Sequence, residues 1–356
     1  MSNYLSAVQA AAVQIGAQAD QSFDGSLPRT ALVDSAGRVL SRLRQDIGMF
    51  HHDSGTLFSC APVGPHQLPA GHAIARMFIR WRKEEPSVTA LVTVAAAHFG
   101  VPAASPALQA ALMLGIAADV ETTNPYHSNH HFREVVAMMA RLIDVNNRLA
   151  CDGHDGVAML DHNDIALCLC AAAAHDLLHD GRNNAPAGPE SWRQYRLENA
   201  SIVAAEPFMK IARMNAEDIE RVRVMIRVTD VSAPQGIDSP HRILRKICRK
   251  DTTVHVPSEL VALTRDKKLL AMSAMMSDAD LGPSGATNYI FCRMQTHLFS
   301  RENPGFSPTD KNIGGFLGFV LENTFISPAA QQAAQPSLSL MVEKVNDRIR
   351  REAAAG

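Results

Sequence analysis

The chain has 356 residues, a formal net charge of −2, 46% hydrophobic residues and only 5% aromatic residues. This length predicts one large domain with an appended segment. The small net charge excludes a general electrostatic attraction to duplex nucleic acid or to an anionic membrane. Partners must therefore be sought at individual sites.

Cysteine usage and hydropathy indicate the compartment. The six cysteines include no Cys-x-x-Cys pair, which fits a reducing environment. No uncharged apolar stretch approaches ~18 residues, and the first residues show no secretory leader. We therefore expect a cytoplasmic protein without a membrane span, with secretion by a route that needs no cleavable signal left open.

Residues 1–105 predict a helical and loop segment. A break at 25–28 and a stretch rich in Gly, Pro and His at 51–72 divide it. His51-His52-Asp53 contains ligand-type side chains, but no predicted helix frames it, so we expect a loop there. The helical pattern is present at 5–13, 29–50, 72–82 and 86–99.

Residues 106–326 predict one all-α domain, because helical patterns follow one another with no alternating strand signal. An Ala-, Gln- and Pro-rich linker and an amphipathic helix near 338–351 form the tail, 327–356. This helix can pack on its own domain or on a second subunit of a homodimer. Helices are expected near 126–149, 163–179, 190–213, 216–230, 239–250, 257–281, 286–300 and 309–325.

The basic stretch 241–250 has two interpretations. Its cations could bind an anionic substrate, or they could form the solvated face of a helix. We favour the solvated face.

The central motif is His175-Asp176-Leu177-Leu178-His179, at the end of a strongly apolar run. On a helix, His175 and His179 would share one face, with Asp176 one residue round. Burying a carboxylate beside imidazoles is costly unless a cation or hydrogen bonds compensate. The pattern therefore predicts three ligand atoms that converge on a divalent metal, with Gly181 ending the helix.

Two further segments carry polar residues of the same kind. His127 and His131 are again four residues apart, and Glu134 lies one turn beyond. Asp278 and Asp280 end a Met-rich apolar stretch. Together with the central motif, these segments predict one polar pocket between helices.

These motifs resemble the HD-domain metal phosphohydrolases, in the variant found in class I cyclic-nucleotide phosphodiesterases. The central run to Asn184 is similar to the family signature. Tyr126-His127-Ser128-x-x-His131-x-x-Glu134-Val135 resembles the family's Tyr-His-Asn-x-x-His-Ala-x-Asp-Val. Leu197-Glu198-Asn199 and Ala279-Asp280-Leu281 match its Leu-Glu-Asn and Ala-Asp-Leu in the same order. The resemblance spans roughly 124–326 and implies an all-α, HD-type multi-helix bundle preceded by an N-terminal helical segment.

The resemblance also implies roles for individual residues. Two divalent metals are expected, with Zn, Mn or Fe at the first position and Mg or Mn at the second. His127 would be the general acid, and Asp176 would bridge the two metals. The ligands of the first metal would be His131, His175, Asp176 and Asp280. The residues that order metal-bound water or brace the loop would be His179, Glu198 and Asn184.

Recognition of the base is where the sequence departs from the family. The family places a purine-binding glutamine and, shortly after it, a stacking phenylalanine on a late helix. Here Phe316 can stack, and Tyr126 would also line the substrate pocket, but Ile313 stands at the glutamine position and Pro283 replaces an asparagine. A base edge facing Ile313 would lose a hydrogen bond.

We therefore expect a metal-dependent phosphodiesterase, with a cyclic nucleotide as the nearest family precedent. The alternatives are a diester that is not a cyclic nucleotide, linked to a protein, a lipid or a nucleotide, and an HD-type phosphomonoesterase or nucleotidase. A partner-binding module that keeps the metal only as a structural staple is a further alternative. It would need neither a second metal position nor an acid.

Overall fold

The computed structural model describes residues 1–18, 27–58 and 68–355. Within these residues no β-sheet forms, and the only extended pairing is an isolated bridge between Pro186 and Gly188. The expected all-α class is confirmed. The helices are α1 Ser2–Gln18, α2 Arg29–Leu57, α3 Leu68–Glu84, α4 Val88–His98, α5 Pro106–Ala118, α6 Asn129–Cys151, α7 His162–Ala174, η1 Pro189–Ser191, α8 Arg196–Ile211, α9 Ala216–Arg227, α10 Pro240–Cys248, η2 Ser258–Thr264, α11 Lys267–Gly285, α12 Tyr289–Glu302, α13 Asp310–Gly315, the π-helical turn η3 Phe316–Val320, α14 Pro328–Ala333 and α15 Gln335–Ala355.

Helix α7 forms the centre of the core. A capping box begins it, since Asp161 accepts from the Asp164 backbone N–H and Asp164 from that of Asp161. Every residue from 164 to 174 is buried, and neighbouring helices α5, α6, α9 and α11 pack around α7. Lys268 at the start of α11 lies 3.0 Å from Asp161 and 2.7 Å from Asp164, which aligns these two helices.

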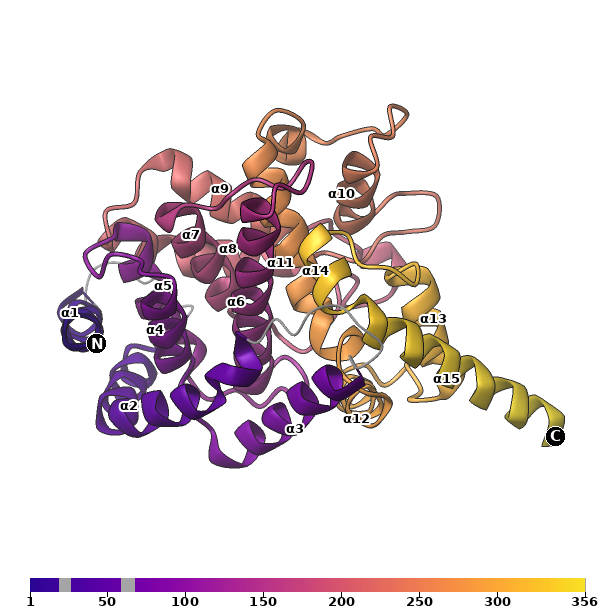
Figure 1. Ribbon diagram of the computed structural model, residues 1–356, viewed down its shortest axis with the longest axis horizontal. Helices are drawn as coiled ribbons and strands as arrows, with labels where there is room; N and C mark the ends of the chain where they lie inside the picture. Colours follow the sequence, from indigo (N-terminus) through magenta and orange to yellow (C-terminus); the bar gives the residue numbers. More distant parts are fainter. Residues whose placement is uncertain (19–26, 59–67, 356) are drawn as a thin grey trace.

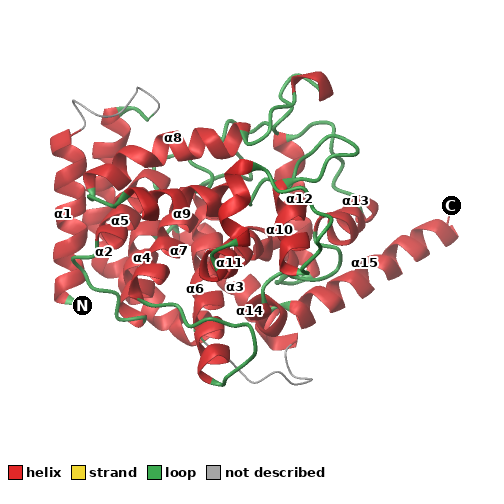
Figure 2. Ribbon diagram, turned by 90° about the horizontal axis from the view of Figure 1, so that it is seen from above, coloured by secondary structure: helices red, strands yellow, loops and turns green. Residues whose placement is uncertain are grey.

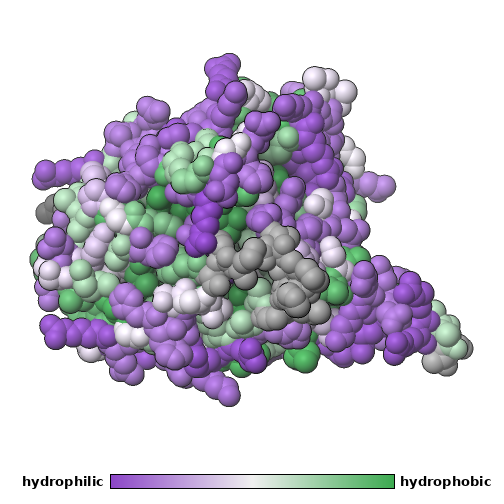
Figure 3. Space-filling view, in the orientation of Figure 1, coloured by the Kyte–Doolittle hydropathy of each residue, from purple (hydrophilic) through white to green (hydrophobic). Residues whose placement is uncertain are grey.

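Helices α1 and α2 and the C-terminal end of α15 lie at opposite ends of the molecule (Figures 1 and 2). Helices α1 and α2 pack against α4 and α5, whereas α3 reaches α6 and α15. Helix α15 packs against α13 and then projects away from the body (Figure 1). Most of the projecting part is hydrophilic on the face shown in Figure 3.

Two segments differ from the sequence-based expectations. His51, His52 and Asp53 were expected in a loop, but α2 continues through them to Leu57. Buried Asp53 forms an ion pair with Arg80 and accepts from Trp81 Nε1 at 2.8 Å, which holds the last turns of α2 against α3. The expected linker after 327 is instead helix α14, whose buried alanines pack near α6. The predicted break at 25–28 and the stretch 51–72 lie partly outside the described residues.

The basic stretch is helix α10 and the turn after it, and most of its cations have protein partners. Lys246 lies 2.5 Å from Asp238, Arg249 lies 2.7 Å from Glu322, and buried Arg245 donates to the Thr324 carbonyl. These cations therefore pair with acidic side chains or a backbone carbonyl of the same protein and stabilise the packing of α10.

In the three described ranges, no helix combines the length and the apolar character needed to cross a lipid bilayer.

Candidate metal centre and cavity

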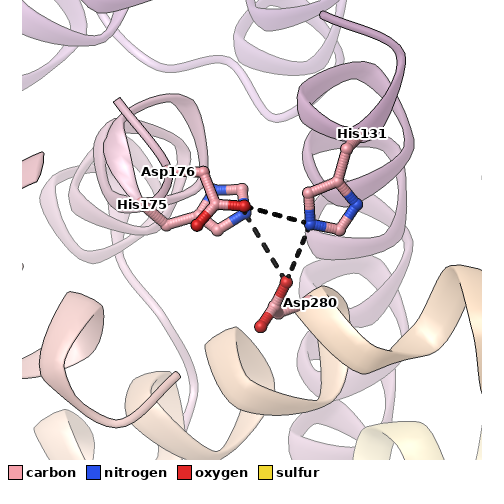
Figure 4. Close-up of side chains that lie close together, drawn as sticks. All are labelled: His131, His175, Asp176 and Asp280. Atoms are coloured by element: carbon pink, nitrogen blue, oxygen red, sulfur yellow. Dashed lines mark hydrogen bonds and ion pairs between the residues drawn. The ribbon is translucent and has the colours of Figure 1, made fainter. Parts of the chain in front are cut away.

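Four side chains from three helical segments converge on one point (Figure 4). They are His131 on α6, His175 and Asp176 directly after α7, and Asp280 on α11. His131 Nε2 lies 3.0 Å from Asp280 Oδ1 and 3.4 Å from Asp176 Oδ2. His175 Nε2 lies 3.3 Å from Asp176 Oδ2 and 3.5 Å from Asp280 Oδ1. Ligand atoms at about 2.1 Å from one ion lie about 3.0 Å apart around an octahedron and about 3.4 Å apart around a tetrahedron. The observed separations therefore fit a bound divalent ion.

The protonation of His175 also fits a ligand. Its Nδ1 lies 3.0 Å from the Ala172 carbonyl, so Nδ1 carries the proton that is donated there. Nε2 is buried, has no hydrogen-bond partner and points into the cluster. A backbone acceptor that fixes the tautomer of a ligand histidine is a common feature of metal sites.

The electrostatics of the cluster favour a cation. Burial opposes the charge of His131 and His175, but Asp176 and Asp280 outweigh it and raise the pKa to about 9 for His131 and about 10 for His175. Burial would likewise raise the pKa of Asp280, yet the two neighbouring histidines lower it to about 2. The two carboxylates thus favour positive charge at this point. A bound divalent metal supplies this charge and replaces the protons of His131 and His175.

The expectation that His175 and His179 share one helical face was wrong. Helix α7 ends at Ala174, and the next residues form a turn in which Leu178 has a left-handed backbone with φ +61°. His175 and Asp176 therefore remain in the cluster, whereas His179 points elsewhere. Gly181 has φ +72°, as expected for a left-handed residue, but it follows the turn and does not end the helix.

His179 instead stacks on His127, with ring centroids 3.5 Å apart and an interplanar angle of 19°. His127 precedes α6, which begins at Asn129, so the expected helical pairing with His131 was also wrong. Burial and the neighbouring charge of His127 lower the pKa of His179 to about 3. His179 Nδ1 accepts from the Gly181 N–H, so Nε2 carries the proton of the neutral ring.

The sequence analysis missed Glu302, the last residue of α12. Its Oε2 lies 2.5 Å from His127 Nδ1, and its Oε1 accepts from the backbone N–H groups of Tyr126 at 2.6 Å and His127 at 2.9 Å. Burial would raise the pKa of Glu302, but these bonds and the charge of His127 hold it below its usual value. Glu302 orients the His127 ring and leaves Nε2 free for another partner. No motif surrounds Glu302 in the sequence, and 175 residues separate it from His127.

A second polar group surrounds Glu198. Asn184 donates to Glu198 Oε2 at 3.2 Å and accepts from the Leu197 N–H, so it braces the loop after α7. Burial and the nearby charge of Asp230 raise the pKa of Glu198. Asp230, another residue that the motifs did not indicate, is 2% exposed and accepts from the Tyr195 N–H.

All of these groups except His175 and Glu302 line one cavity of about 600 Å³. Tyr126, Ile313 and Phe316 also line it, and Phe316 lies in the π-helical turn η3. Burial and the charge of Asp280 raise the pKa of Tyr126, so its phenol stays protonated. Apolar side chains make up much of the remaining lining: Val231, Leu281, Phe299, Phe306, Phe319 and Val320. The structure thus places the predicted site residues in the lining of this cavity, except His175, which is buried in the cluster with His131, Asp176 and Asp280.

Comparisons with solved structures identify the fold. The phosphodiesterase domain of a rhodopsin phosphodiesterase from the choanoflagellate Salpingoeca rosetta is 16% identical over 80% of this chain and 87% of that chain, with a TM-score of 0.47. A second structure of that domain is 15% identical over 86% and 97%, with a TM-score of 0.48. LmjPDEB1, solved in complex with IBMX, is 14% identical over 81% and 96%, with a TM-score of 0.50. A scan of protein-family profiles and a search of curated proteins gave no match.

The resemblance that the motifs predicted is confirmed at the level of the fold, which is that of the helical phosphodiesterase catalytic domain. At this level of identity, similarity establishes architecture, and the chemistry must be argued from the site.

Proposed function

We propose that this chain, with its helical fold and this cavity, is a metal-dependent phosphodiesterase. The observation that carries the proposal is the geometry of two groups in one region. One group is the cluster that can hold a divalent metal, formed by His131, His175, Asp176 and Asp280. The other is the ring of His127, which lies beside this cluster and is oriented by its contact with Glu302. A divalent metal can activate water for attack on a phosphodiester, and an oriented imidazole beside it can protonate the leaving oxygen.

The four clustered side chains would hold the first metal. Asp176 has a second carboxylate oxygen and lines the cavity, so it would also contact a second metal. When bound, the pair would polarise the phosphoryl oxygens and activate a water for in-line attack. Zn, Mn or Fe would suit the first position, with its mixed nitrogen and oxygen ligands, and Mg or Mn would suit the second. The Nε2–H of His179 and the carboxyl of Glu198 would order water around the second position.

His127 would be the general acid. Its Nδ1 is occupied by Glu302, which leaves Nε2 to donate a proton to the departing oxygen. The Glu302 carboxylate fixes the direction of the ring. A dedicated general acid favours diesters with an alkoxide leaving group, because an alkoxide departs slowly unless it receives a proton.

The cavity wall bears on the choice of substrate. Ile313 is 1% exposed and offers no hydrogen bond to a base, while Phe316 presents a ring to the cavity. A flat or apolar group would fit this wall better than a purine read through its polar edge. We therefore propose two substrate classes: cyclic nucleotides, and phosphodiesters other than cAMP and cGMP.

The test is hydrolysis of a substrate panel by purified protein with added Mn²⁺, Mg²⁺ or Zn²⁺. The panel contains cAMP, cGMP, bis(4-nitrophenyl) phosphate and 4-nitrophenyl phosphate, with Asp176→Ala as the inactive control. Diester cleavage that Asp176→Ala abolishes supports the proposal. Cleavage of the aryl diester without cyclic-nucleotide turnover selects the second substrate class. Activity confined to the monoester would refute a phosphodiesterase.

A further inference from the structure

A buried polar link joins the N-terminal helices to the cavity. Arg82 on α3 donates through Nε to Glu134 Oε1 at 3.0 Å and through Nη2 to Gln295 Oε1 at 3.0 Å. Gln295 Nε2 in turn donates to the other oxygen of Glu134. The side chains of Arg82 and Glu134 are only 14% and 2% exposed, and Gln295 is 1% exposed. Three helices, α3, α6 and α12, therefore meet in one closed hydrogen-bonded triangle.

Two corners of this triangle, Glu134 and Gln295, lie close to functional groups. Glu134 is one helical turn from His131 on α6, and Gln295 lines the cavity from α12. Phe299 and Glu302 follow Gln295 on the same face of α12, at four and seven residues. At 1.5 Å per residue, Gln295 lies only about 10 Å from the carboxylate-bearing end of the helix. Glu302 at that end orients His127.

The position of α12 depends on this link in two ways. Phe78 of α3 contacts Phe291 of α12, with ring centroids 5.7 Å apart, one turn before Gln295. The guanidinium of Arg82 then fixes the separation between Glu134 and Gln295, because it donates to both. Without the guanidinium, the buried Glu134 carboxylate keeps only the Gln295 amide as a donor in this triangle, and α12 is no longer held at a fixed distance from α6. A movement of α12 carries Glu302 with it.

We propose that Arg82 is a positioning residue for the reaction. It comes from the N-terminal segment and holds α12 against α6, so that Glu302 keeps the His127 imidazole aimed at the leaving oxygen while His131 stays in the metal cluster. The inference rests on the proposed phosphodiesterase function and assigns part of the catalytic apparatus to residues before 106. Arg82 acts through Gln295 and Glu302 and contacts no substrate.

The matched control is on the same helix. Arg80 lies two residues from Arg82 and pairs with buried Asp53 of α2, away from α12. Arg82→Met and Arg80→Met each remove one guanidinium that pairs with a buried carboxylate, so both should lower thermal stability. Only Arg82→Met should change the orientation of His127, the proposed general acid.

The first readout is the dependence of kcat on the leaving group, measured with methyl phenyl phosphate and methyl 4-nitrophenyl phosphate. Phenolate needs the proton of the acid more than 4-nitrophenolate does. We expect Arg82→Met to lower kcat for the phenyl ester about tenfold more than for the nitrophenyl ester, with KM changed less than about twofold. Arg80→Met should leave this ratio at the wild-type value, and Arg82→Lys should restore part of it.

The second readout does not need activity. In protein labelled with ¹⁵N-histidine, the His127 Nδ1–H bonded to Glu302 gives a resonance that His127→Gln identifies. This resonance should shift or disappear in Arg82→Met and stay in place in Arg80→Met. If Arg82→Met does not fold, Gln295→Leu cuts the same link and should give the same two results.

The outcomes separate the two proposals. A wild-type leaving-group ratio and an unchanged His127 resonance in a folded Arg82→Met or Gln295→Leu variant would overturn the inference. A wild-type protein that cleaves no diester would refute the proposed function. The resonance alone would then decide whether Arg82 controls the position of His127.

Discussion

Removal of one ligand from the metal cluster gives the sharpest prediction. Asp280→Asn keeps the shape of the side chain but removes the charge that lies 3.0 Å from His131 Nε2 and 3.5 Å from His175 Nε2. An ion present at 1,000 times its Kd stabilises the folded protein by about 4.1 kcal/mol. At about 2.1 cal/mol/K per residue, unfolding of a 356-residue chain carries about 0.75 kcal/mol/K. Chelation should therefore lower the Tm of the wild-type protein by about 5 °C.

The assay is differential scanning calorimetry of metal-loaded protein before and after EDTA, with the metal content measured by elemental analysis. Asp280→Asn should purify with less metal and lose the EDTA-dependent shift. Asp180→Asn is the control, because Asp180 follows the same motif but pairs with Arg196 at the surface. The reasoning fails if stoichiometrically loaded wild-type protein shows no EDTA effect, or if Asp280→Asn retains the full shift.

Three further predictions concern the surroundings of the cluster. A charge-assisted hydrogen bond is worth about 1.5–3 kcal/mol, so Glu302→Gln should lower kcat about 10- to 100-fold on diesters with alkoxide leaving groups. If steady-state kinetics show no loss, Glu302 does not support His127 as the general acid. Gly181→Ala should cost about 1–2 kcal/mol in urea unfolding, because φ is +72° and a Cβ would meet Asn124 Oδ1 at 3.0 Å; an unchanged midpoint contradicts this. Burial raises the pKa of Asp119 from 3.8 to about 6, so the folded protein keeps a proton that the unfolded chain releases. Between about pH 4 and pH 7 the wild-type unfolding free energy should therefore fall by about 3 kcal/mol relative to Asp119→Asn; a pH-independent difference would show that Asp119 ionises normally.

Much of the fold was accessible from the sequence because helical periodicity is a local property. The helix expected near 216–230 corresponds to α9, and the helix expected near 286–300 corresponds to α12. The expected single helix over 257–281 is instead η2 followed by α11, with Asp266 as the N-cap that separates them. Local patterns thus located the helices and left their ends to side-chain capping and packing.

The site was accessible only where its residues carry motifs. His131, His175, Asp176 and Asp280 converge as the ordered motifs indicated. The arrangement of His179 was not predictable from its spacing, because the turn after Ala174 uses a left-handed leucine, a conformation that the sequence does not favour. Glu302 and Arg82 lie in segments without motifs and act through contacts between distant parts of the chain, which no local pattern encodes.

The distribution of the ligands over three helices has a consequence for how the protein matures. His131 and Asp280 are 149 residues apart, so the growing chain has no complete ligand set until most of it has left the ribosome. Closing a loop of that length is entropically unfavourable before the core around α7 has formed. A metal bound at this cluster would therefore be acquired by an assembled helical core. Newly made protein would then pass through a compact metal-free state, in which the supply of ions in the cell determines which metal enters.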